Sequence, residues 1–234
     1  MEWDEIERAM VVFAHPDDAE FGSAGTVARL TRDGKQVVYV VVTDGSKGSS
    51  DPSMSRETLL KLRQDEQRAA AAVLGVADVC FLAFEDGMLE PTLEVRKAIS
   101  GAIRRYKPDV VIAQSPLRDL TLGVFAQHPD HLAVGEATFG AVYPAARDRM
   151  TFPELLTEGL EPHNVREMWV AGTPNADYFV DVSETIELKV DALRAHASQT
   201  GDRDVHVFVP ERAHQVGEPQ GLEYAEGFKR IQIP

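Results

Sequence analysis

Short apolar runs alternate with longer runs of helix-forming residues through most of the chain. Residues 37–42 are almost all β-branched or aromatic, which is typical of a strand buried on both faces. Shorter apolar runs at residues 11–14, 79–83 and 110–113 predict further strands. The intervening segments have helical composition and spacing: 21–32, 56–74, 93–106 and 131–143. This alternation predicts an α/β fold with a Rossmann-like, mostly parallel sheet and helices on both faces.

The pattern is less regular toward the C-terminus. Residues 151–164 have no clear period and are expected to form a surface loop or a short helix. Residues 165–171 and 177–182 predict two more strands. Ser183 is then expected to cap a helix over residues 184–195.

Length and composition narrow the class of protein. The 234 residues fit a single domain over 1–234, and the net charge of -14 argues against a nucleic-acid partner. The same charge could also reflect a saline habitat or a need for solubility. A lone cysteine, Cys80, cannot form an internal disulfide and is expected on a buried strand. The acidic N-terminus and the lack of a long apolar stretch predict a cytoplasmic protein without a membrane span.

A polar cluster directly follows the first apolar run, in the stretch Ala14-His15-Pro16-Asp17-Asp18. In an open parallel sheet, ligands bind at the carboxyl ends of the strands, where this cluster would lie. His15 and Asp18 are three residues apart in a turn, so both could face one divalent ion. Asp17 would remain available for another role.

A second cluster, Gln127-His128-Pro129-Asp130-His131, repeats the same chemistry far along the chain. A catalytic zinc commonly has three protein ligands and an open position for water, so His15, Asp18 and His131 would form a complete set. Alternatively, each His-Pro-Asp triplet only forms a turn and caps the following helix. Two such clusters, each before a helix, favour a metal site. Zinc is the first choice, although His/His/Asp sites also take iron, cobalt or nickel.

The two clusters resemble the Ala-His-Pro-Asp-Asp and His-Pro-Asp-His motifs of the PIG-L/LmbE-like metal-dependent N-deacetylases. Weaker matches follow in the family's order, so that the resemblance covers nearly all the chain: Thr43-Asp44-Gly45, residues 63–75, Asp86-Gly87 and residues 193–199. The resemblance implies an LmbE-like fold, with Arg63 and Asp86 binding the substrate and residues 224–228 against the outer wall of the site. On composition alone, Arg63 is a helix-surface charge and Asp86 a turn former. For His196, the sequence supports a catalytic role and a structural role equally.

The residues also predict a reaction. A bound metal would lower the pKa of a water from about 15.7 to roughly 7 and polarise an amide carbonyl. Asp17 could accept the proton of that water as general base. His128 could protonate the leaving amine or stabilise the oxyanion, with Asp130 orienting its imidazole. Some relatives have a tyrosine before the second motif, a position filled here by Phe125-Ala126-Gln127.

The predicted function is therefore zinc-dependent hydrolysis of an N-acetyl or related N-acyl group from an N-acetylglucosamine-type sugar conjugate. Ala19-Glu20 after the first motif resembles the subgroup that acts on small conjugates of this kind. A thiol conjugate, a glycosylated natural product or a sugar-lipid headgroup are alternative substrates, and specificity would lie in residues 46–55, 114–126 and 151–164. A non-catalytic sugar- or nucleotide-binding protein is the other class, but it leaves the twin clusters unexplained. The sequence also leaves open whether the protein forms a homo-oligomer.

Overall fold

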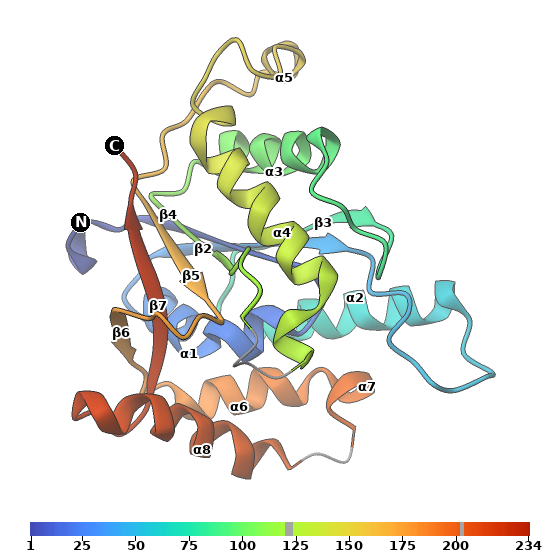
Figure 1. Cartoon of the computed structure of the whole chain (residues 1–234). Helices are drawn as coiled ribbons and strands as arrows, with labels where there is room; N and C mark the ends of the chain where they lie inside the picture. Colours follow the sequence, from blue (N-terminus) through green and yellow to red (C-terminus); the bar gives the residue numbers. More distant parts are fainter. Residues whose placement is uncertain (120–123, 202–203) are drawn as a thin grey trace.

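A computed structural model describes residues 1–119, 124–201 and 204–234. Its described strands form one seven-stranded sheet in the order β3-β2-β1-β4-β5-β7-β6 (Figure 1). The strands are β1 (Arg8–Phe13), β2 (Gln36–Thr43), β3 (Asp78–Phe84), β4 (Val110–Gln114), β5 (Glu167–Ala171), β6 (Tyr178–Asp181) and β7 (Ala225–Gln232). Neighbours from β3 to β5 are parallel, whereas β7 runs antiparallel to both β5 and β6. The predicted mostly parallel, Rossmann-like sheet is confirmed.

Helices cover both faces of this sheet, as predicted (Figure 1). The described helices are α1 (Asp18–Arg32), α2 (Arg56–Val73), α3 (Leu93–Tyr106), α4 (Pro129–Gly140), α5 (Glu154–Thr157), α6 (Ile186–Arg194), α7 (Ala197–Thr200) and α8 (Val205–Gly217). Short η turns lie at Trp3–Glu5, Val124–Gln127, Ala141–Ala145 and Glu218–Gln220. Helices α1, α2 and α6 pack on one face, and α3 and α4 pack on the other. Within the described ranges, no helix is long and apolar enough to cross a membrane.

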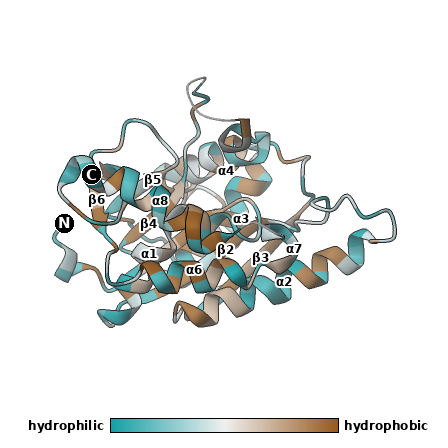
Figure 2. Ribbon diagram, turned by 90° about the horizontal axis from the view of Figure 1, so that it is seen from below, coloured by the Kyte–Doolittle hydropathy of each residue, from teal (hydrophilic) through white to brown (hydrophobic). Residues whose placement is uncertain are grey.

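The central strands separate two hydrophobic cores. Along β1, Val11 and Phe13 face the core under α1 and α2, while Met10 and Val12 face the core under α3 and α4. Burial of each side chain of this size contributes roughly 1.5–3 kcal/mol to the stability of the fold. The outer helices in Figure 2 carry both hydrophilic and hydrophobic stretches, because only one side of each contacts the sheet.

Two local predictions are wrong. Ser183 does not cap a helix: it donates to Asp181 Oδ1, and α6 begins after Thr185 without a side-chain cap. Cys80 is only half-buried because β3 is an edge strand. Of residues 224–228, expected against the outer wall of the site, Ala225–Phe228 form the first half of β7 and pair with β6, so that placement stays a prediction.

The strand order reverses between β1 and β4, which pair side by side at the centre of the sheet. The chain leaves β1 toward β2 on one side and leaves β4 toward β5 on the other. Such a reversal opens a crevice at the carboxyl ends of the strands. Both polar clusters of the sequence follow these two strands and therefore meet at this crevice.

Candidate active site and metal centre

The first cluster leaves β1 in a tightly bonded turn. Ala14 donates its amide to Gln114 Oε1 at 3.0 Å, and its carbonyl accepts from the amide and hydroxyl of Thr43 at 2.8 Å each. Asp17 then adopts the left-handed conformation with φ 96°, and α1 begins at Asp18. The amide of His15 donates to Asp18 Oδ2 at 2.9 Å. These bonds hold His15 and Asp18 on the same side of the turn.

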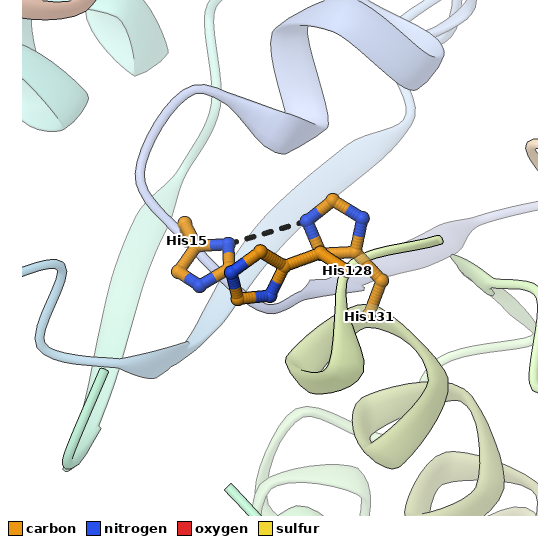
Figure 3. A group of neighbouring side chains, drawn as sticks. All are labelled: His15, His128 and His131. Carbon is orange, nitrogen blue, oxygen red and sulfur yellow. Dashed lines mark hydrogen bonds between the residues drawn. The ribbon is translucent and has the colours of Figure 1, made fainter. Parts of the chain in front are cut away.

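The second cluster forms the first turn of α4. Pro129 occupies the start of the helix, where its missing N–H is no loss, and His128 is the N-cap. His128 Nδ1 accepts from the Asp130 amide at 3.2 Å. His131 projects from the same turn toward the first cluster (Figure 3). The cap thus uses one nitrogen of His128 and leaves the other for a ligand or substrate.

Three ligand atoms converge between the clusters. His15 Nδ1 lies 3.2 Å from His131 Nε2 (Figure 3). Asp18 Oδ2 lies 3.2 Å from His15 Nδ1 and 3.1 Å from His131 Nε2. Atoms bound to a tetrahedral ion at about 2.1 Å would lie roughly 3.4 Å apart. The three predicted ligands therefore fit around one divalent ion with little movement.

His128 is a competing ligand. The imidazoles of His15, His128 and His131 are also close enough to share an ion, with ring centroids 4.8 Å apart for His15 and His128 and 5.3 Å for His128 and His131. Asp18 offers a third ligand atom in the same place, because its Oδ2 lies 3.2 Å from His15 Nδ1 and 3.1 Å from His131 Nε2.

The second nitrogen of His15 faces two carboxylates. His15 Nε2 lies 3.1 Å from Asp130 Oδ2 and 3.2 Å from Asp86 Oδ1. The Asp130 carboxylate also accepts from the amides of Gly87 at 2.7 Å and Leu89 at 3.2 Å. Among the described hydrogen bonds this carboxylate does not contact His128, so the contact expected between Asp130 and His128 is replaced by one to His15.

Asp86 and Arg63 are also engaged within the protein. The second oxygen of Asp86 accepts from the Lys47 amide at 2.9 Å. Arg63 is buried and donates to the carbonyls of Pro16 at 2.7 Å and Gly45 at 3.0 Å. Both side chains border the crevice, but their observed contacts hold its loops together.

The imidazoles and carboxylates of the site shift one another's pKa values strongly. Burial alone would lower the pKa of His15, yet hydrogen bonds to Asp130, Asp18 and Asp86 outweigh it and raise the pKa to about 12. Burial would raise the pKa of Asp18, but His131 and His15 hold it well below its usual range. The pKa of Asp86 is about 2, because the hydrogen bond to His15 outweighs burial. The pKa of Asp130 is lowered as well, by its hydrogen bonds to His15 and to the Gly87 and Leu89 amides against the effect of burial, so three ionised carboxylates surround the His15 imidazole and give a setting that favours positive charge.

The pKa values of Asp17 and His128, the two proposed catalytic groups, are shifted in opposite directions. Burial and the neighbouring charge of Asp18 raise the pKa of Asp17 to about 7, although Arg63 lies 3.4 Å away and acts in the other direction. Burial and the charge of His15 lower the pKa of His128. Near neutral pH, Asp17 is therefore poised to exchange a proton, and His128 is a neutral imidazole.

Four buried residues support the site, and three of them, Gln114, Gln67 and Glu20, were not assigned a role of this kind from the sequence. Gln114 donates to Asp18 Oδ2 at 3.1 Å, and Gln67 accepts from the Asp17 amide at 3.1 Å. Glu20 and His196 lie behind Gln67. Of these, His196 had a sequence signal, since it lies in the family match over residues 193–199, and Gln114 directly follows the predicted strand 110–113. In the predicted loop 114–126, residues 120–123 and the side chains of Phe125 and Ala126 lie outside the described part of the chain.

Comparison with known families agrees with the site. A family described as "PIG-L: GlcNAc-PI de-N-acetylase" matches residues 10–142. The chain is 33% identical to diacetylchitobiose deacetylase of Thermococcus kodakarensis over 98% of its own length and 85% of the relative's. It is 30% identical to 1D-myo-inositol 2-acetamido-2-deoxy-alpha-D-glucopyranoside deacetylase of Actinosynnema mirum, over 82% of this chain and 80% of the relative.

Solved structures show the same likeness. N,N'-diacetylchitobiose deacetylase from Pyrococcus horikoshii superimposes with a TM-score of 0.90 at 31% identity, covering 98% of this chain and 85% of that one. A 4-carboxy-2-hydroxymuconate hydratase from Pseudomonas putida gives 0.80 at 20% identity, over 97% of each chain. The second comparison shows the fold alone. Because its name describes a different reaction, the fold does not decide the chemistry, and the site residues must.

Proposed function

Since the chain belongs to the PIG-L family of GlcNAc-PI de-N-acetylases, we propose that it is a zinc-dependent deacetylase acting on an N-acetylglucosamine-type sugar conjugate. One observation carries the proposal: a His/Asp/His set at 3.1–3.2 Å spacing lies beside an aspartate with a raised pKa. Metal-assisted hydrolysis needs this combination of an ion site and a proton acceptor.

His15 Nδ1, Asp18 Oδ2 and His131 Nε2 would hold the metal. When bound, the ion supplies an acidified water and a positive charge that polarises the amide carbonyl. Asp130 and Asp86 would keep the proton of His15 on Nε2, so that Nδ1 is free to bind the ion. Gln114 would fix the Asp18 carboxylate by the hydrogen bond to Oδ2.

Asp17 would act as general base. Its pKa of about 7 lets it take a proton from water near neutral pH and release that proton afterwards. The released proton can pass to the amine as the amide C–N bond breaks. Asp17 alone can therefore serve both proton transfers.

His128 would stabilise the oxyanion. Because Nδ1 accepts from the Asp130 amide, the ring proton of the neutral imidazole is on Nε2, which can donate to the developing charge. The lowered pKa of His128 favours this role over protonation of the leaving amine. His128 would thus supply the function that a tyrosine has in some relatives.

The sugar specificity is proposed from the relatives, whose names describe deacetylases of diacetylchitobiose and of a 2-acetamido-glucopyranoside. Arg63 and Asp86 are proposed to shape the crevice on the substrate side. Their engagement with loop carbonyls and with the Lys47 amide supports a role through the loops.

The test is release of acetate and free amine from a panel of N-acetyl sugars, including diacetylchitobiose and N-acetylglucosaminyl glycosides, by protein loaded with zinc. We expect turnover on at least one member and none after chelation. Sugar binding without acetate release from any member would contradict the proposal and favour a binding protein. Iron, cobalt and nickel reconstitution in the same assay compares the alternative metals.

Three broader features are part of the proposal. Because β1 and β7 belong to the same sheet, residues 1–234 are treated as one catalytic domain. A cytoplasmic location is proposed from the single cysteine. The oligomeric state would be measured by light scattering.

A further inference from the structure

Asp17 has a backbone conformation that must be held by its surroundings. Its φ of 96° and ψ of -29° lie in the left-handed region, which is unusual for a residue other than glycine. Such a conformation is strained and persists only where neighbouring contacts enforce it. The contacts to its amide are therefore informative.

Gln67 makes the contact to that amide. It projects from α2, is fully buried, and accepts from the Asp17 N–H through Oε1 at 3.1 Å. Its Nε2 donates to Glu20 Oε1 at 2.8 Å. An amide side chain has one accepting and one donating end, so the bond to Glu20 determines which end faces Asp17.

Glu20 is in turn fixed by His196. The second oxygen, Glu20 Oε2, lies 3.1 Å from His196 Nε2, and neither residue is exposed to solvent. The result is a continuous line of three fully buried polar side chains from a C-terminal segment to the backbone of Asp17.

Stability alone does not explain this arrangement. Removing a carboxylate and an imidazole from water costs free energy that their mutual attraction only partly offsets, and apolar residues of similar size are often at least as stabilising. The line ends at the strained backbone of Asp17. A role in holding the backbone of Asp17 accounts both for the buried polar side chains and for the place where their line ends.

We propose that Gln67, Glu20 and His196 form a positioning relay that holds Asp17 in its left-handed conformation. The proposal rests on the proposed role of Asp17 as general base. Among the described hydrogen bonds, none of these three side chains contacts His15, Asp18 or His131, and the line reaches the site through the turn that carries Asp17. His196 is thereby assigned a positioning role.

Two substitutions interrupt the relay at different points. Gln67→Met removes both hydrogen bonds at similar size, and His196→Leu removes the donor to Glu20. In both variants we expect kcat to fall about 10- to 100-fold, the range found for residues that orient active-site groups, with KM and zinc content unchanged. His196→Gln keeps an N–H donor and should recover most of the lost kcat.

The double variant Gln67→Met/His196→Leu tests whether the residues act as one line. Its kcat should be no lower than that of Gln67→Met alone, because the first break already disconnects His196. Thr26→Val is the matched control: Thr26 is fully buried in α1, and its hydroxyl has no partner among the described residues. This control should retain wild-type kcat.

Hydrogen exchange provides a readout that does not depend on activity. In metal-free and zinc-loaded protein, the amide of Asp17 should exchange faster in Gln67→Met than in wild type or Thr26→Val. If the wild-type protein deacetylates nothing, the proposed function fails, and exchange still tests the relay. If His196→Leu does not fold, Gln67→Met and His196→Gln remain decisive.

Three results would overturn the relay. Full kcat with unchanged Asp17 exchange in Gln67→Met would show that the backbone is held by other contacts. Loss of zinc from that variant would show that Gln67 supports the metal ligands instead. Equal activity losses in His196→Gln and His196→Leu would show that the imidazole acts through its shape and not through the donated hydrogen bond.

Discussion

Replacing Asp17 with asparagine should raise the stability of the metal-free protein while abolishing most turnover. The substitution is nearly isosteric, and asparagine tolerates the left-handed backbone well, so the turn at φ 96° should persist. It removes the proposed base and touches no proposed ligand. General-base catalysis typically contributes 10²- to 10⁴-fold, which sets the expected loss of kcat.

The stability change follows from the pKa of Asp17, which is raised from 3.8 to about 7 by burial and by Asp18. A raised pKa means that the folded state disfavours the ionised carboxylate. This penalty is absent below pH 4, grows between pH 4 and pH 7, and is complete above pH 7. About three pH units at 1.36 kcal/mol each give roughly 4 kcal/mol as an upper limit, because Asp17 and Asp18 share the effect.

The measurements are urea unfolding of metal-free wild type and Asp17→Asn at pH 5 and pH 8, and kcat of the zinc-loaded proteins with metal content determined. We expect the variant's stability advantage to be larger at pH 8. Wild-type kcat/KM should also fall on the acid side of an apparent pKa at or below 7, since a bound cation lowers the pKa of Asp17. Near-normal turnover with full zinc content would refute Asp17 as the base, and an equal stability change at both pH values would refute the burial argument.

Three further predictions test the other groups. His131→Ala should lose most of the metal by elemental analysis, and full retention would reject the ligand set. His128→Ala should keep its metal and lose about 10²- to 10³-fold in kcat without a change in the shape of the pH profile; loss of the alkaline limb would instead identify His128 as the general acid. Asp130→Asn should weaken zinc binding about 10- to 100-fold in a competition titration, whereas unchanged affinity would show that its contact with His15 is dispensable.

The fold was predictable because its signals are local. The β-branched run of β2 and the helical composition of α2 and α3 depend on neighbouring residues, and their predicted bounds are close to the observed ones. Position within the sheet is a tertiary property. The sequence around Cys80 could not show that β3 is an edge strand, and the sequence of β7 could not show that it pairs between β5 and β6.

The two histidine-containing motifs were visible because each places several ligand types within five residues. The role of the residues that support these motifs was not visible in the sequence, because it depends on burial and packing. Gln67 and His196 are ordinary polar residues on helical segments, and a sequence does not show that both are fully buried. Their proximity to Asp17 arises only when α1, α2 and the segment before α7 pack together.

Asp130 shows the same limit at the level of single atoms. The sequence places its carboxylate two residues from His128, which suggests an interaction with that imidazole. In the helix turn, however, the Asp130 amide reaches back to His128 Nδ1, and this bond points the carboxylate across the crevice to His15 Nε2. One residue therefore sets the proton position of both histidines: its amide leaves the ring proton of His128 on Nε2, and its carboxylate leaves Nδ1 of His15 free for the ion. The division of labour between the two imidazoles, one for the metal and one for the oxyanion, follows from this geometry and not from the spacing of the motif.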